Sequence, residues 1–168
     1  MVIAEMRAAA GDTNDIAGAA VRPPRLHLAA IAAGLALDWI VPATLAPGGL
    51  SLAPRAAIGG GLVGVGLALF AWAIGRFRAA GTPVPTVEPT RAIVADGPYR
   101  FSRNPIYLAM ALVHAGVAAA ADNAWILVLL APTLIVIRYG VIAREERYLE
   151  RKFGVDYLAY KARVRRWV

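Results

Sequence analysis

Long apolar stretches alternate with short polar segments along most of the chain. Four such stretches follow one another, at residues 26–46, 56–77, 105–121 and 124–143. A helix needs about 20 mostly apolar residues to cross a bilayer. The pattern therefore predicts an all-α integral membrane bundle with four transmembrane helices. The third stretch is the shortest, and we expect it either to tilt little or to lie over a thinned cytoplasmic edge.

Arginine and lysine lie mostly on one side of these predicted spans. The link between the first two spans contains one such residue, Arg55, and the turn between the last two contains none. Most of the others lie before residue 26, at 77–104 and after residue 143. Because cytoplasmic segments are enriched in these residues, we predict a multi-pass protein with both termini and the 77–104 loop in the cytoplasm.

The two ends of the chain differ from its apolar middle. Residues 1–25 contain scattered acidic residues among alanines and no apolar core of signal-peptide length, so we predict a cytoplasmic N-terminal tail. Residues 144–168 are charged but carry apolar side chains at helical spacing, which predicts a cytoplasmic helical tail. Residues 26–168 are expected to form one membrane domain.

Composition excludes several classes of site. The chain has no cysteine, which excludes disulfides and thiolate metal sites, and its two histidines lie far apart in sequence, so we expect no bound metal. The net charge of +7 does not indicate nucleic acid, because the basic residues flank apolar spans. Such residues are explained by membrane topology and by anionic lipid headgroups.

Some residues inside the spans interrupt the apolar pattern. Gly60 and Gly64 predict a face for close helix packing, with Gly59, Gly61 and Gly66 beside it. Packing within the chain is the favoured reading, with a dimer contact as the alternative. Pro132 removes a backbone hydrogen bond and predicts a kink. Asp38 and His114 both fall near mid-membrane, where ionisable groups are functional candidates. A hydrogen bond between these two side chains is the favoured reading, with a substrate contact as the alternative.

Polar and aromatic residues gather where the third span begins, at residues 97–108 (GPYRFSRNPIYL). Asn104 and Pro105 are favoured at a helix start, and the exposed N–H groups of such a start attract anions. Arg103 adds charge there, and Tyr99 and Tyr107 add ring faces and hydroxyls. The segment predicts an anion site, although the same residues also suit simple anchoring at the membrane surface.

Glu145 and Glu146 lie just after the fourth span, where the helix dipole disfavours negative charge. Arg144 and Arg147 are the nearest cations in sequence and would make an ordinary solvated cluster. The alternative is a ligand with a cationic and an anionic end, bound between this pair and the start of the third span. S-adenosylmethionine, with its sulfonium, amine, carboxylate and ribose, fits that description.

Two motifs resemble a known family, the isoprenylcysteine carboxyl methyltransferases and related phospholipid methyltransferases. Residues 97–108 resemble the Arg-(His/Asn)-Pro-x-Tyr motif, and residues 145–167 (EERYLERKFGVDYLAYKARVRRW) resemble the Glu-Glu tail motif. Residues 81–85 (GTPVP) resemble bacterial members, which implies a bacterial inner-membrane location. The sequence departs from many members at Asn104, where eukaryotic enzymes have His, and at Ala109, where many have Gly.

The resemblance implies a membrane methyltransferase that uses S-adenosylmethionine on a lipophilic acceptor. Together with the chemistry of the acceptor, it suggests Arg103, Arg144 and Glu146 as catalytic residues. The cofactor-binding residues are Tyr99, Arg103, Asn104, Pro105, Tyr107, Glu145 and Glu146.

The acceptor chemistry has alternatives. A carboxylate acceptor is already ionised and needs only an arginine to orient it, for which Arg103, Arg138 and Arg144 are candidates. A phospholipid amine must lose a proton, which Glu145 or Glu146 would accept. The isoprenylcysteine-type carboxyl reaction is the leading expectation. A sterol-reductase-like enzyme using a nicotinamide cofactor and a non-enzymatic membrane subunit are the more distant alternatives.

Overall fold

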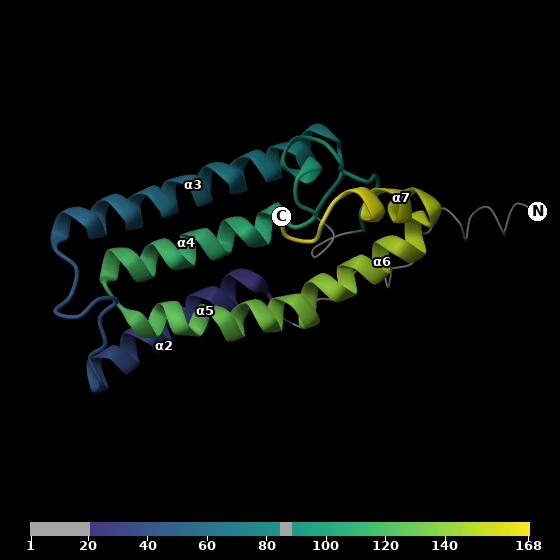
Figure 1. Cartoon of the computed structure of the whole chain (residues 1–168). Helices are drawn as coiled ribbons and strands as arrows, with labels where there is room; N and C mark the ends of the chain where they lie inside the picture. Colours follow the sequence, from purple (N-terminus) through teal and green to yellow (C-terminus); the bar gives the residue numbers. More distant parts are fainter. Residues whose placement is uncertain (1–20, 85–88) are drawn as a thin grey trace, which may run out of the picture.

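The computed structural model describes residues 21–84 and 89–168, and this part of the chain is helical, with irregular connections and no strand (Figure 1). The all-α class is therefore confirmed. The predicted tail at residues 1–25 lies mostly outside the described residues. The helices are α2 (Pro23–Ile40), α3 (Leu52–Ala79), α4 (Pro105–Ala121), α5 (Ala124–Ile137), α6 (Ala143–Phe153) and α7 (Val155–Arg163), with a 3₁₀ turn, η1 (Gly97–Arg100), and a π-helical segment, η2 (Arg138–Ile142).

The helices that correspond to the predicted spans form two pairs. α3 packs along α4, α2 packs along α5, and contacts between α4 and α5 join the pairs (Figure 1). η2 and α6 continue the line of α5, and α7 then turns back toward the start of α4. This arrangement brings the segment before α4 next to α6 and α7 at one end of the bundle.

Two helices end away from their predicted bounds. α2 stops at Ile40 rather than residue 46, and Val41 leaves the helical region with φ −134°. Pro42 explains the early stop, because the residue before a proline disfavours helical backbone. Helix also continues without a break past residue 143, the predicted end of the fourth span, through η2 and α6 to Phe153. Pro132 lies inside α5, which continues past it.

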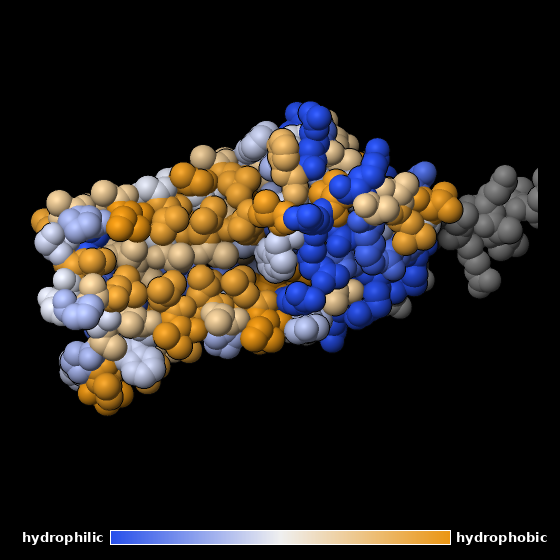
Figure 2. Space-filling model, viewed as in Figure 1, coloured by the Kyte–Doolittle hydropathy of each residue, from blue (hydrophilic) through white to orange (hydrophobic). Residues whose placement is uncertain are grey.

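Two helices of the described chain are long and apolar enough to cross a membrane, Leu52–Ala79 and the continuous Ala124–Phe153. Pro105–Ala121 is a shorter apolar helix. Figure 2 shows apolar side chains over α3, α4 and α5 and a dense hydrophilic region over α6 and α7. These features fit a membrane protein, while the four-span topology stays a prediction.

The glycines that allow α3 and α4 to approach are not the predicted pair. A Cβ on Gly59 would lie 2.6 Å from the Ala120 nitrogen, and one on Gly66 would lie 2.8 Å from Val113. Nothing lies within 4 Å of a Cβ built on Gly60 or Gly64. Close packing within the chain is therefore made by Gly59 and Gly66, seven residues apart on the same helix face.

The predicted bond between Asp38 and His114 is wrong. His114 Nδ1 lies 2.9 Å from Nδ1 of His27 on α2, and its Nε2 lies 3.0 Å from the Ile126 carbonyl. Asp38 instead accepts the Ala43 N–H at 2.9 Å. The reason is position, because Asp38 stands at the end of α2 and satisfies a backbone donor that follows the helix.

The end of the bundle that holds residues 41–51 and 120–125, here called the turn end, is closed by hydrogen bonds. Asp122 adopts a left-handed φ of 53° and its two oxygens accept the N–H groups of Leu45 and Leu50, at 3.2 and 2.6 Å. Asn123 caps α5, and Arg55 donates to a carbonyl at the end of α4. These bonds tie the α2–α3 connection to the α4–α5 turn.

Candidate functional site

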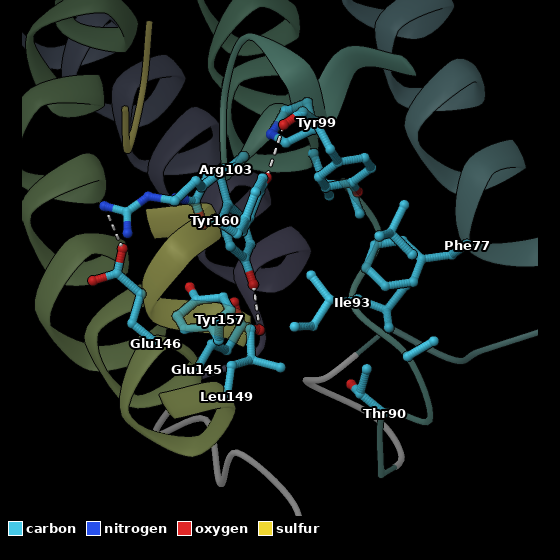
Figure 3. A pocket seen from close by; sticks show the side chains of 17 residues that line it. Phe77, Thr90, Ile93, Tyr99, Arg103, Glu145, Glu146, Leu149, Tyr157 and Tyr160 are labelled. Atoms are coloured by element: carbon cyan, nitrogen blue, oxygen red, sulfur yellow. Dashed lines mark hydrogen bonds and ion pairs between the residues drawn. The ribbon is translucent and has the colours of Figure 1, made fainter. Parts of the chain in front are cut away.

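The opposite end of the bundle, here called the pocket end, consists of η1, the start of α4, α6, α7 and residues 164–168. It contains a cavity, the first cavity, lined by residues from each of the two predicted motifs (Figure 3). Predicted site residues that line it are Tyr99, Arg103, Asn104, Pro105, Tyr107, Glu145 and Glu146. Segments about 40 residues apart in the chain therefore meet at one site, as the Tyr107–Glu145 hydrogen bond also illustrates.

The start of α4 is built largely as the sequence indicates. Pro105 occupies the first turn of the helix and Asn104 the N-cap position. The Asn104 side chain does not cap the helix, however, and donates through Nδ2 to the Arg166 carbonyl at 2.9 Å. The backbone N–H of Asn104 donates to Ser102 Oγ at 3.1 Å. This segment is thus fixed by the C-terminal residues as well as by its own turn.

Glu146 is held by two arginines. Arg103 Nη2 lies 3.1 Å from Oε1, and Arg166 binds both oxygens, with Nε at 3.0 Å and Nη2 at 2.7 Å. The Glu146 side chain is 7% exposed and the Arg103 side chain 8%. Arg144 and Arg147, the cations nearest in sequence, are exposed on α6. The compensating charge therefore comes from distant arginines.

Glu145 has a different partner. Tyr107 donates its hydroxyl proton to Glu145 Oε1 at 2.8 Å, and both residues are buried. Glu146 thus binds Arg103 and Arg166, and Glu145 accepts a hydrogen bond from a phenol. Tyr107 lines both the first cavity and a second one, and Glu145 lines the first.

The first cavity is lined by buried polar atoms that have no hydrogen-bond partner. These atoms are Thr90 Oγ1, Tyr99 Oη and the Nε and Nη1 atoms of Arg103. Within the described residues, His27 Nε2 is the one other buried side-chain atom of this kind. An unsatisfied buried polar group costs about 1–3 kcal/mol, more when charged, so such groups are rare and require a reason. Their concentration in one cavity indicates a ligand site.

Aromatic rings cover much of the same cavity. Phe77 and Tyr99 meet edge to face at 5.3 Å between centroids. Tyr160 donates its hydroxyl to the Tyr99 carbonyl at 2.8 Å, and burial raises the pKa of Tyr160 to about 12, so this phenol stays a donor. Burial likewise raises the pKa of Tyr99 and Tyr157.

Figure 3 shows how these groups are distributed. The Arg103–Glu146 pair lies on one side, Phe77 and Ile93 lie on the other, and the α7 tyrosines stand between them. The free volume is about 70 Å³, below the roughly 300–1,000 Å³ of typical ligand pockets. A ligand with one charged and one aromatic end matches this division, and its entry requires side chains of the cavity to move.

A second cavity of about 530 Å³ adjoins the first. The two share Val84, Ile106 and Tyr107. The second cavity lies between the start of α2, the last part of α3 and the start of α4, with mostly apolar walls. Its charged lining residues within the described chain are Arg22 and Arg25. An elongated apolar molecule placed there would reach the first cavity at Tyr107.

Two candidate arginines are not brought to either cavity. Arg144 is exposed on α6, and Arg138 is exposed and stacks over the Tyr139 ring at 5.4 Å. Sequence reasoning did not select Thr90 or Arg166. Thr90 lies in an irregular segment with no periodic pattern, and the signal for Arg166 was only its place in a basic tail. No group of three or more potential metal ligands occurs among the described residues.

The apolar helices and the cavity with unpartnered polar atoms at one end fit a membrane protein with a candidate ligand site. The family model for phospholipid methyltransferases matches residues 54–156, more than half of the chain. The chain therefore belongs to the phospholipid methyltransferase family, as the motifs predicted, and membership implies a methyltransferase.

A curated relative adds little about function. The chain is 57% identical over 35 residues to an uncharacterized protein of Haemophilus influenzae. The match covers 21% of this chain and 56% of that protein, so the chain spans about half the length of the relative. No solved structure matches the chain.

Proposed function

We propose that this chain transfers a methyl group from S-adenosylmethionine to a lipophilic acceptor at the cytoplasmic face of the membrane. The observation that carries the proposal is the set of buried, unpartnered polar atoms of Thr90, Tyr99 and Arg103 in one cavity. They lie among residues of both motifs that resemble the family, and the family match includes all three.

The residues of the first cavity suit the parts of this cofactor. The unpartnered N–H groups of Arg103 suit the carboxylate of the methionine end, since a guanidinium donates strongly to carboxylates. Glu145 supplies negative charge for the cationic centre. Phe77, Ile93 and the α7 tyrosines suit the nucleoside, with the hydroxyls of Thr90 and Tyr99 as its hydrogen-bond partners. When bound, S-adenosylmethionine supplies an electrophilic methyl group on its sulfonium.

The second cavity is the proposed acceptor site. Phe70, Ile74 and Met110 give it apolar walls, and it meets the first cavity at Tyr107. An acceptor there would present its reacting atom to the first cavity, where burial excludes water and the walls fix its approach. The role proposed for the chain is therefore alignment and desolvation of two bound molecules.

A carboxylate is the leading acceptor, as in the isoprenylcysteine enzymes. It is nucleophilic without loss of a proton, and Arg22 and Arg25 give the second cavity a positive charge that favours an anion. The second candidate is a phospholipid amine. The Tyr107–Glu145 pair favours it, because Tyr107 lines both cavities and Glu145, which lines the first, would accept the ammonium proton. The family name also favours it.

The membrane arrangement is part of the proposal. Four spans, of which α2 and α4 would be the shorter ones, place the pocket end and both termini in the cytoplasm. The concentration of arginine and lysine at the pocket end supports this orientation. Arg144, although a catalytic candidate from the sequence, lies outside both cavities and is left out of the proposed machinery.

Calorimetric titration of the purified chain in detergent tests the cofactor. We expect S-adenosylhomocysteine to bind wild type and to bind Arg103→Ala far more weakly. Binding of NADPH in its place would support a reductase-like enzyme, and binding of neither nucleotide would leave a non-enzymatic subunit.

Methyl transfer into a total lipid extract identifies the acceptor class. The chain is incubated with S-adenosylmethionine labelled in its methyl group, and the lipid product is treated with alkali. A methyl ester releases the label as methanol, as expected for a carboxylate acceptor. Label that withstands alkali indicates the amine reaction.

A further inference from the structure

The last residues of the chain contact Arg103 and Glu146, which form the charged side of the first cavity. After α7 the chain runs back to the start of α4 (Figure 1), where the Arg103 N–H donates to the Arg165 carbonyl at 3.0 Å. Trp167 packs against the buried cluster that contains Tyr107 and Ile137. Residues 164–168 are thus fixed at the site by backbone hydrogen bonds and by an apolar anchor.

Arg166 is the side chain by which this segment contacts the site. It binds both oxygens of Glu146 in a two-pronged contact, at 3.0 and 2.7 Å. Arg103 uses a single nitrogen, Nη2, on Oε1 of the same carboxylate. The hydrogen bond to Glu146 raises the pKa of Arg166. The orientation of Glu146 is therefore set mainly by Arg166.

The contact of Arg103 with Glu146 determines which of its donors stay available. With Nη2 on the carboxylate, Nε and Nη1 have no partner among the described residues. If Glu146 turned, Arg103 would follow it or lose the contact. Because a guanidinium is a rigid planar fork, a small rotation would redirect all its donors.

We propose that Arg166 is a positioning residue for the first cavity: it fixes Glu146, and Glu146 holds Arg103 so that Nε and Nη1 stay available to the bound ligand, one of them to donate to its carboxylate. The role rests on the proposed function, since it assigns that carboxylate to S-adenosylmethionine. The match to the family model ends at residue 156, so Arg166 lies beyond the region on which membership stands.

Three variants and two ligands test this role. Arg166→Ala removes the contact, Arg166→Lys keeps the charge without the two-pronged geometry, and Arg165→Ala is the matched control, an exposed arginine of the same segment. The ligands are S-adenosylhomocysteine and 5′-methylthioadenosine, which has the same nucleoside and sulfur but no amino-acid end. Kd is measured by calorimetry on full-length protein in detergent.

We expect Arg166→Ala to weaken S-adenosylhomocysteine binding by on the order of 10-fold or more and to leave 5′-methylthioadenosine binding unchanged, which also shows that the variant is folded. Arg166→Lys should fall in between, and Arg165→Ala should match wild type. In an Arg103→Ala background, Arg166→Ala should have no further effect on either ligand.

Other outcomes overturn the role. Equal affinities of wild type and Arg166→Ala for S-adenosylhomocysteine would overturn the positioning role alone, with the proposed function intact. Equal losses for both ligands would mean that Arg166 supports the fold rather than Arg103, and would also overturn it. A wild-type chain that binds neither ligand would overturn the proposed function and this role with it.

Discussion

The turn end and the pocket end of the bundle both contain buried polar side chains, but these have different partners. At the turn end, both oxygens of Asp122 accept backbone N–H groups, and Asn123 caps α5. At the pocket end, buried atoms of Thr90, Tyr99 and Arg103 have no partner in the described chain. The turn end provides hydrogen-bond partners for Asp122 and Asn123 within the chain, whereas the pocket end leaves donors and acceptors available for a ligand.

The difference separates a structural role from a binding role. The hydrogen bonds of Asp122 close two loops on each other, so their energy contributes to folding. The unpartnered atoms of the pocket end lower stability until a ligand satisfies them. Substitutions at the two ends should therefore change different quantities, stability at the turn end and ligand affinity at the pocket end.

The largest expected effect on ligand affinity is that of Arg103→Ala. Removing a buried charged contact to a ligand costs about 2–4 kcal/mol, roughly 30- to 1,000-fold in the Kd of S-adenosylhomocysteine. Stability should change little, because Arg166 still pairs with Glu146. Calorimetry measures the Kd, with Arg147→Ala, an exposed arginine of α6, as the control. Equal affinities for both variants would contradict the binding role of the pocket end.

Glu146→Gln should lower both affinity and stability. It leaves Arg103 and Arg166 without their shared negative charge, and breaking a buried ion pair costs about 3 kcal/mol or more. Thermal unfolding in detergent measures the change. Glu150→Gln is the control, because its pair with Lys161 is about one-third exposed and contributes under about 1 kcal/mol. Similar losses of stability in the two variants would contradict the large contribution expected from the buried ion pairs of Glu146.

Asp122→Ala should affect stability alone. The variant loses two hydrogen bonds and a residue that tolerates left-handed backbone, which together amount to about 2–3 kcal/mol. Asp122→Asn keeps one acceptor and the backbone tolerance, so its loss should be smaller. The free energy of unfolding and the Kd of S-adenosylhomocysteine are both measured. A changed Kd in folded Asp122→Ala would contradict the expectation that the turn end contributes to stability and not to ligand binding.

The smallest effects are expected from two neighbouring glycines of α3. A Cβ at Gly59 would clash with the backbone of Ala120, so Gly59→Ala should cost about 1–3 kcal/mol. Gly60 faces open space, and Gly60→Ala should gain up to about 1 kcal/mol from helix propensity. Thermal unfolding of the two variants measures the expected loss of stability in Gly59→Ala and the expected gain in Gly60→Ala. Equal behaviour would mean that α3 and α4 do not pack as described.

Hydropathy predicted several helix boundaries correctly, but it did not predict the contacts between the helices. It predicted the bounds of α4 and the start of α5, because those boundaries follow from composition and from Asn and Pro at helix starts. It could not tell which face of α3 packs, since glycines are present on several faces. The bond that His114 makes with His27 likewise depends on tertiary placement.

The site was predictable in part. The motifs named Arg103, Tyr107 and both glutamates, and the fold brings these to one cavity. The distribution of charge within it was not predictable, because one of the two arginines that bind Glu146 is Arg166, in a segment without a regular pattern. Thr90 lies in an irregular loop and carries no signal beyond its residue type.

Hydrogen–deuterium exchange, with and without S-adenosylhomocysteine, tests the separation of the two ends most directly. The account predicts that the ligand slows amide exchange at residues 89–107 and 145–168 and leaves residues 41–51 and 120–126 unchanged. Protection at the turn end with none at the pocket end, or no protection at either, would contradict it.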